Sequence, residues 1–232
     1  MIVIPLCDPK TATYNNIIKW ARSLRLPIKY TSDCIKAIIV LGDGTPDEIV
    51  IMILAHLLDG KVDAGIVKPK YLRVGAIRAI KNIALSFHGK ISDFVLLMDL
   101  EDQTQEQILE SLNNKLAEYG IGYQVIERQD MWWKYHCEIA NIRFTLTVII
   151  NGLEKEYEKH TIEDHLLELA QHLKICVSNV QRLKNPKQAW NKIPHKQRKQ
   201  IFEELKRLPI EVRKKIFRQH IEALESIIRT LS

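Results

Sequence analysis

Acidic residues follow two apolar runs of the chain. Asp43 comes shortly after the run of residues 37–41, and Asp99 and Glu101 end the run that begins at Phe94. Because alternate residues of a strand point to the same side, Asp99 and Glu101 can direct their carboxylates together. If the two runs are neighbouring parallel strands, Asp43 joins them at the carboxyl edge of the sheet, where α/β proteins bind ligands.

Three carboxylates at one edge predict a metal site. They would repel one another without a cation, and Mg²⁺ or Mn²⁺ prefers oxygen ligands together with water and substrate phosphate. Such a site supports phosphoryl chemistry, with Asp99 and Glu101 holding the cation and Asp43 assisting proton transfer or a second cation. The alternative is structural, because acids after strands are often helix caps or turn residues. Asp47 and Glu48 are expected to have that simpler role at a helix start.

The chain around these acids alternates between predicted strands and helices. The run 37–41 and the stretch 94–102, which ends in acids, are rich in apolar residues, which is typical of strands buried on both faces. Apolar residues at helical spacing predict helices over residues 14–26, 46–58, 74–87 and 104–120. This alternation predicts an α/β fold, with a mostly parallel sheet flanked by helices.

The second half of the chain has a different pattern. Residues 123–152 show no helical period and contain two β-rich runs separated near Ala140 and Asn141, which predicts an antiparallel extension of the sheet. The remainder is helical in pattern, with prolines between shorter helices. We therefore expect an α/β domain with its β extension over residues 1–156 and a helical C-terminal module over residues 157–232.

Two short motifs resemble the Toprim domain shared by topoisomerases, bacterial primases, overcoming-lysogenization-defect nucleases and small ribosomal-RNA maturases. The stretch "VLGDGTPDE" is similar to that family's strand, Glu-Gly turn and helix, with Asp43 in the place of the glutamate and Gly44 as the glycine. The stretch "LLMDLED" is similar to its strand ending in Asp-x-Asp, with Asp99 as the first aspartate and Glu101 in the place of the second. The likeness spans residues 37–127.

The resemblance implies a Toprim-like fold and Mg²⁺- or Mn²⁺-dependent nuclease or related phosphoryl-transfer activity on nucleic acid. It assigns the family's acid/base role to Asp43 and the metal to Asp99 and Glu101. Asp102 is an additional acid of the second motif, and we include it among the expected metal ligands. Because Asp43 and Glu101 depart from the family's residue types, the second hypothesis is a noncatalytic nucleic-acid-binding or assembly protein that retains the fold.

Positive charge is concentrated in the C-terminal part of the chain. The whole chain has a net charge of +6, whereas residues 182–218 contain thirteen Lys or Arg and three Glu, a net +10. Contacts of Lys and Arg with phosphates give salt-sensitive, largely sequence-independent affinity, so nucleic acid is the expected partner, with DNA and RNA both open. An anionic protein partner or a plain solvated surface is the alternative. The expected nucleic-acid contacts are Lys68, Lys70, Arg73, Lys184, Lys187, Lys192, Lys196, Arg198 and Lys199.

Two further segments are candidates for the site. In "HTIEDHLLELAQH", the residues Glu163, Asp164 and His165 lack the HExxH zinc spacing and suit a capped helix start, although Glu163 or Asp164 could fold back to complete the acidic edge. In "MWWKYHCEI", strand alternation places Trp133 and every second residue after it in the core. It leaves at most Trp132 available for stacking on bases, and the alternative is that the whole strand is simply packed.

Several classes of protein are not indicated. The four cysteines form no CxxC pair, so neither a zinc knuckle nor a disulfide framework is expected. The sequence contains neither a Walker-type phosphate loop nor a GxGxxG motif. It shows no secretory leader and no apolar run of roughly 18 residues, so we expect a cytoplasmic protein that does not enter a membrane. The apolar face of one last helix, expected from Pro209 onward, suits the core or a homo-oligomer contact.

Overall fold

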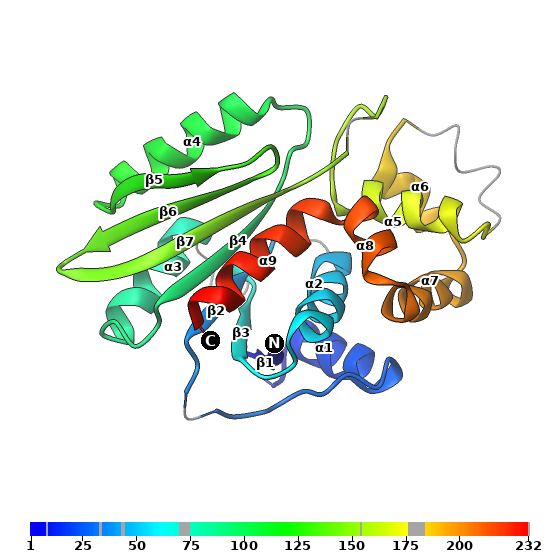
Figure 1. Cartoon of the computed structure of the whole chain (residues 1–232), viewed down its shortest axis with the longest axis horizontal. Coiled ribbons are helices and arrows are strands. Elements are labelled where there is room, and N and C mark those ends of the chain that lie inside the picture. Colours follow the sequence, from blue (N-terminus) through cyan, green and yellow to red (C-terminus); the bar gives the residue numbers. More distant parts are fainter. Residues whose placement is uncertain are drawn as a thin grey trace.

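The computed structural model describes residues 1–7, 9–32, 34–42, 45–69, 75–153, 155–175 and 184–231. Within them the chain forms a seven-stranded mixed sheet in the order β1-β3-β2-β4-β7-β6-β5, flanked by helices (Figure 1). The strands are β1 (Ile2–Pro5), β2 (Ala37–Val40), β3 (Asp63–Val67), β4 (Asp93–Asp99), β5 (Gly122–Arg128), β6 (Trp132–Ile139) and β7 (Ile142–Asn151). The helices are α1 (Ala12–Ser23), α2 (Thr45–Leu58), α3 (Ala76–Ser86), α4 (Gln105–Glu118), α5 (Ile162–His172), α6 (Pro186–Lys192), α7 (His195–Arg207), α8 (Ile210–Ile216) and α9 (Arg218–Leu231). The predicted α/β fold is confirmed.

The parallel part of the sheet contains the strand pair on which the metal hypothesis depends. β1, β3, β2 and β4 run parallel, and β2 pairs with β4 in a register that aligns Val40 with Leu96. All four residues of β2 are buried. The prediction that the two apolar runs are neighbouring parallel strands is confirmed, while Asp43, which follows β2, lies outside the described residues.

The antiparallel part begins at β7, which runs parallel to β4 and antiparallel to β6. Ala140 and Asn141 form the turn between β6 and β7 with φ angles of 48° and 64°. Two-residue hairpin turns favour this left-handed conformation because it matches the twist of the strands. β5 pairs with β6 and adds one more antiparallel strand at the edge. The predicted antiparallel extension is confirmed.

Alternate residues of the central strands contribute to two separate cores. Ile39 and Val95 belong to the core on the side of α1, α2 and the C-terminal helices, whereas Ile38 and Leu96 belong to the core that includes α3 and α4. Successive side chains of a strand point to opposite faces, which explains this division. Figure 1 shows α2 and α9 next to each other on the first side.

The C-terminal helices differ from two expectations. The prediction of a single last helix from Pro209 is wrong. The helical conformation is interrupted at Phe217 (φ −122°, ψ 39°), which separates α8 from α9. The stacking alternative for Trp132 is also wrong and the packed alternative is confirmed. Helix α9 packs against β6, and the Trp132 side chain is 3% exposed, with its Nε1 donating to Glu222 Oε2 at 3.3 Å. None of the helices in the described ranges is long and apolar enough to cross a membrane.

Candidate functional site

The carboxyl edge of the parallel strands gathers two acids around an asparagine. Asp99 ends β4 and Asn151 ends β7, and the strand register places these residues opposite each other. Asp47 lies in the first turn of α2. The Nδ2 group of Asn151 donates to Asp99 Oδ1 at 3.0 Å and to Asp47 Oδ1 at 3.1 Å. One amide group therefore bridges both carboxylates.

Glu163 brings a third carboxylate to this edge from the first turn of α5. Asp47 and Glu163 are 2% and 6% exposed. Burial, together with the charges of Asp99 and Glu163, raises the pKa of Asp47 well above its ordinary value. Burial also raises the pKa of Glu163, and the charge of Asp99 adds to that effect. We call Asp47, Asp99 and Glu163 the acidic edge. The charge of Asp99 disfavours the ionisation of Asp47 and of Glu163.

Lys187, from α6, places an ammonium group at the acidic edge. Its Nζ lies 3.2 Å from Asp99 Oδ2 and 2.9 Å from Glu101 Oε1, while Lys159 Nζ lies 3.1 Å from Glu101 Oε2. Burial lowers the pKa of Lys187, but its contacts with Glu101 and Asp99 outweigh this effect and raise the pKa above its ordinary value. Burial likewise raises the pKa of Glu101, but the two lysines outweigh it and lower that pKa. The structure therefore brings Asp99 and Glu101 together around a lysine.

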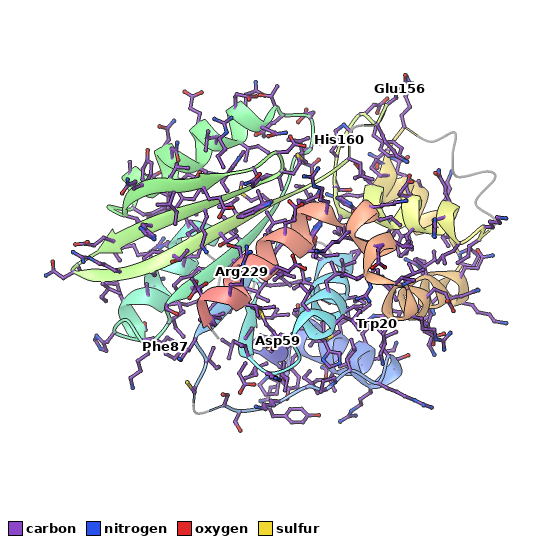
Figure 2. All side chains as sticks on the ribbon, in the orientation of Figure 1. Trp20, Asp59, Phe87, Glu156, His160 and Arg229 are labelled. Atoms are coloured by element: carbon purple, nitrogen blue, oxygen red, sulfur yellow. The ribbon has the colours of Figure 1, made fainter. Side chains whose placement is uncertain are left out.

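Glu101, which contacts Lys187, lies beyond the end of strand β4. β4 ends at Asp99, and Glu101 has a φ of 54°. Its N–H donates to the His160 carbonyl, and its carbonyl accepts from the His160 N–H, both at 2.8 Å. This bridge attaches Glu101 to the segment before α5, where Figure 2 labels His160. The alternation argument therefore does not apply beyond Asp99, although both side chains contact the same ammonium.

The donors at the acidic edge are of the type that Mg²⁺ and Mn²⁺ prefer. Glu163 Oε2 is buried without a hydrogen-bond partner in the described part of the chain, and a cation would satisfy such an oxygen. Among the described residues, no group of three or more His, Cys, Asp or Glu side chains is arranged to hold a metal ion. Asp102 is exposed in the turn after β4, and Asp43 lies outside the described residues. The residue types fit a hard cation, and Lys187 lies between two of the predicted ligands.

A buried pair of histidines supports Asn151 from within the core. His220 Nε2 donates to Asn151 Oδ1 at 2.8 Å, which directs the Nδ2 group toward the acids. The ring of His165 lies 4.9 Å from that of His220, and its Nδ1 donates to the Ile216 carbonyl at 2.6 Å. Burial lowers the pKa of His165 to about 4 and that of His220 well below its ordinary value. Both imidazoles are therefore neutral near pH 7, and His165 belongs to this supporting network.

Asp164 has a local structural role. Its carboxylate accepts from the Leu153 N–H at 3.2 Å, from the Thr161 N–H at 3.3 Å and from His160 Nδ1 at 2.9 Å. These contacts cap the start of α5 and attach it to the segment after β7. Of the two acids that could fold back, Glu163 is the one at the acidic edge.

The predicted nucleic-acid contacts occupy different environments. Lys68 is 5% exposed and forms an ion pair with Glu48 at 2.5 Å, so it is covered by other residues. Lys199 pairs with Glu203 at 3.6 Å on α7. Lys184, Lys192 and Lys196 are exposed. Lys70 and Arg73 lie outside the described residues. Lys187 is at the acidic edge, and Arg198 lines a cavity beside it.

This cavity has a volume of about 400 Å³. Its walls include Trp20 from α1, Trp190 from α6 and Phe202 from α7. Glu163 and Lys187 also line it. The cavity is therefore lined by Glu163 of the acidic edge and by Lys187, which contacts Asp99 of that edge. We call this space the aromatic cavity.

Fold and site together define an α/β protein with a carboxylate and lysine cluster at the carboxyl edge of its parallel strands. Comparisons with protein-family models, curated proteins and solved structures found no match to this chain.

Sequence reasoning missed Asp47 and Asn151 as members of the site. The sequence predicts only a helix-start charge at Asp47, and its position in the first turn of α2 agrees with this, whereas its burial depends on the elements against which α2 packs. Asn151 ends an apolar strand run in the same way as Asp99 does. That position was the signal that could have identified Asn151.

Proposed function

We propose that this chain is a Toprim-like protein that cleaves or transfers nucleic-acid phosphodiesters with Mg²⁺ or Mn²⁺. The observation that carries the proposal is the meeting of Asp47, Asp99 and Glu163 at the carboxyl edge of parallel strands. Burial makes their shared negative charge costly, so the cluster favours a cationic ligand. The two motifs of the Toprim resemblance follow β2 and β4, which are neighbours in the sheet, and this adjacency supports the proposal.

The side chains have distinct roles in this proposal. Asp99 and Glu163 would hold the cation, and Asp43 keeps the part in proton transfer that the resemblance gives it. A cation held by these residues would supply positive charge to the phosphate and would help to activate the attacking group. Asp47, whose pKa is raised, keeps a proton at a pH where an ordinary aspartate has lost it. In the substrate complex of this proposal, the ammonium of Lys187 leaves Asp99, which it contacts here, and forms an ion pair with the phosphate.

A noncatalytic nucleic-acid-binding or assembly protein is the second candidate function. One specific observation favours it: the ammonium of Lys187 contacts both Asp99 and Glu101, where the metal was expected. In a protein of this kind the lysine would replace the cation permanently. The exposed basic side chains of the C-terminal helices would then bind nucleic acid without cleaving it.

A cleavage assay distinguishes the two functions. Labelled single-stranded and double-stranded DNA and RNA are incubated with the protein and Mn²⁺ or Mg²⁺, and the products are separated on denaturing gels. Asp99→Asn and Glu163→Gln each remove one charge with little change of shape. Asp130→Asn removes one charge from an exposed acid in the turn between β5 and β6 and is the matched control.

We expect cleavage by the unmodified protein and by the control, and a loss of about 100-fold or more in each site variant. Cleavage that persists in Asp99→Asn would exclude this site. Binding without cleavage under every metal condition would support the noncatalytic function.

A further inference from the structure

Aromatic side chains line the aromatic cavity. Trp20, Trp190 and Phe202 are at most 9% exposed, and the ring of Phe202 meets the two indoles edge-on at centroid distances of 5.2 and 5.6 Å. The ring of His195 lies 5.9 Å from that of Trp20, with an angle of 35° between their planes. Figure 2 labels Trp20 on α1, close to the helices that supply the other rings. A volume of about 400 Å³ is in the range of pockets that bind small molecules.

Two charged side chains at this cavity have unsatisfied buried atoms. Glu163 Oε2 and Arg198 Nε are each buried without a hydrogen-bond partner in the described ranges. Leaving such atoms unpaired costs free energy, which a bound ligand with hydrogen-bonding groups would recover. Lys187 also lines the cavity while its Nζ contacts Asp99. A ligand in the cavity therefore meets a guanidinium, an ammonium and the acidic edge at the same time.

We propose that the aromatic cavity binds one unpaired nucleotide of a single-stranded nucleic acid. The base packs against the exposed ring of His195 and the accessible part of Trp20, and its phosphate lies at Arg198 and Lys187. Aromatic rings stack on any base, and a guanidinium matches the geometry of a phosphate. This inference rests on the proposed function and deepens it by naming the class of substrate.

The location of the cavity gives the proposal a specific consequence. Since Lys187 lines the cavity and contacts Asp99 of the acidic edge, a phosphate held by Lys187 lies next to Asp99 and Glu163. A base in a duplex is stacked on its neighbours and enters a pocket only after it is flipped out, which costs free energy. Single strands and unpaired ends therefore bind more tightly than a duplex of the same length.

Binding is measured in a chelator, so that no cleavage interferes. The probe is an oligothymidylate strand with a dye at its far end, compared with the same strand in a duplex, and the readout is fluorescence polarisation. Arg198→Gln removes the cation at the cavity, and His195→Ala removes an exposed ring from its wall. Arg207→Gln is the matched control, because Arg207 is an exposed arginine of the same helix that pairs with Glu204. Circular dichroism checks that each variant is folded.

We expect Arg198→Gln to weaken single-strand binding by about tenfold or more, the factor expected for one charge-assisted contact, and the control to change it by less than about threefold. His195→Ala should weaken binding to a similar degree. Equal losses in Arg198→Gln and Arg207→Gln, or tighter binding of the duplex, would overturn the proposal. Binding that depends on Arg198 in a protein that never cleaves would leave this inference standing and refute the nuclease function. Cleavage together with unchanged binding in both cavity variants would refute this inference and leave the nuclease function standing.

Discussion

Replacing Lys187 with methionine tests the charge balance of the acidic edge. Methionine keeps the apolar stem of the side chain and removes the ammonium that contacts Asp99 and Glu101. The Lys187 side chain is 40% exposed, so solvent screens both ion pairs. Each pair therefore contributes about 0.5–1 kcal/mol to the free energy of unfolding, well below the roughly 3–5 kcal/mol lost when a fully buried pair is broken. The two pairs together amount to about 1–2 kcal/mol, which lowers the melting temperature of a chain of this size by about 2–8 °C.

Thermal unfolding followed by circular dichroism measures this effect in chelator and again with Mn²⁺. In chelator, Lys187→Met should melt below the unmodified protein. With Mn²⁺, the variant should gain more stability than the unmodified protein, because its carboxylates no longer share an ammonium and a ligand that binds the folded state stabilises it. Lys159→Met is the control, since the ion pair of Lys159 is with Glu101 and not with Asp99. An unchanged melting temperature in chelator, or the same Mn²⁺ shift in all three proteins, would refute the reasoning.

Three other predictions concern the same region. Because the folded-state pKa of Asp47 is raised above its ordinary value of 3.8, this carboxyl favours folding at pH values below 3.8, and its contribution is lost as the pH rises through the folded-state pKa. Asp47→Asn should therefore leave stability unchanged or raise it at pH 7 and flatten its pH dependence above pH 3.8, as measured by urea unfolding over a pH series. Asn151→Leu should lower the free energy of unfolding by about 1–3 kcal/mol, because it leaves the buried Asp47 without its donor; an unchanged urea midpoint would contradict that role. The double variant Lys192→Gln, Lys196→Gln should reduce the salt dependence of oligonucleotide binding, with the logarithmic slope smaller by roughly 1–2, and an identical slope would exclude these two lysines as phosphate contacts.

Local patterns in the sequence determined the elements of this fold. The stretches predicted as strands at 37–41 and 94–102 contain β2 and β4, the second of which ends already at Asp99, and Ala140 and Asn141 form a hairpin turn. Strand periodicity and turn conformation depend on residues that are close in the chain. The position of acids after the strands was also visible, since it follows from the order of residue types. These features could be predicted without knowing what lies beside them in space.

Only the tertiary structure decided which of those acids meet. Asp47 and Glu163 stand 116 positions apart, yet both lie within the electrostatic reach of Asp99 because α2 and α5 pack near the same strand ends. Lys187 comes to Asp99 from still further along the chain. No periodicity encodes such meetings, because they depend on the order of the strands in the sheet and on how the C-terminal helices cover it. The burial that shifts the pKa of Asp47 and leaves Glu163 Oε2 unpaired arises from that packing.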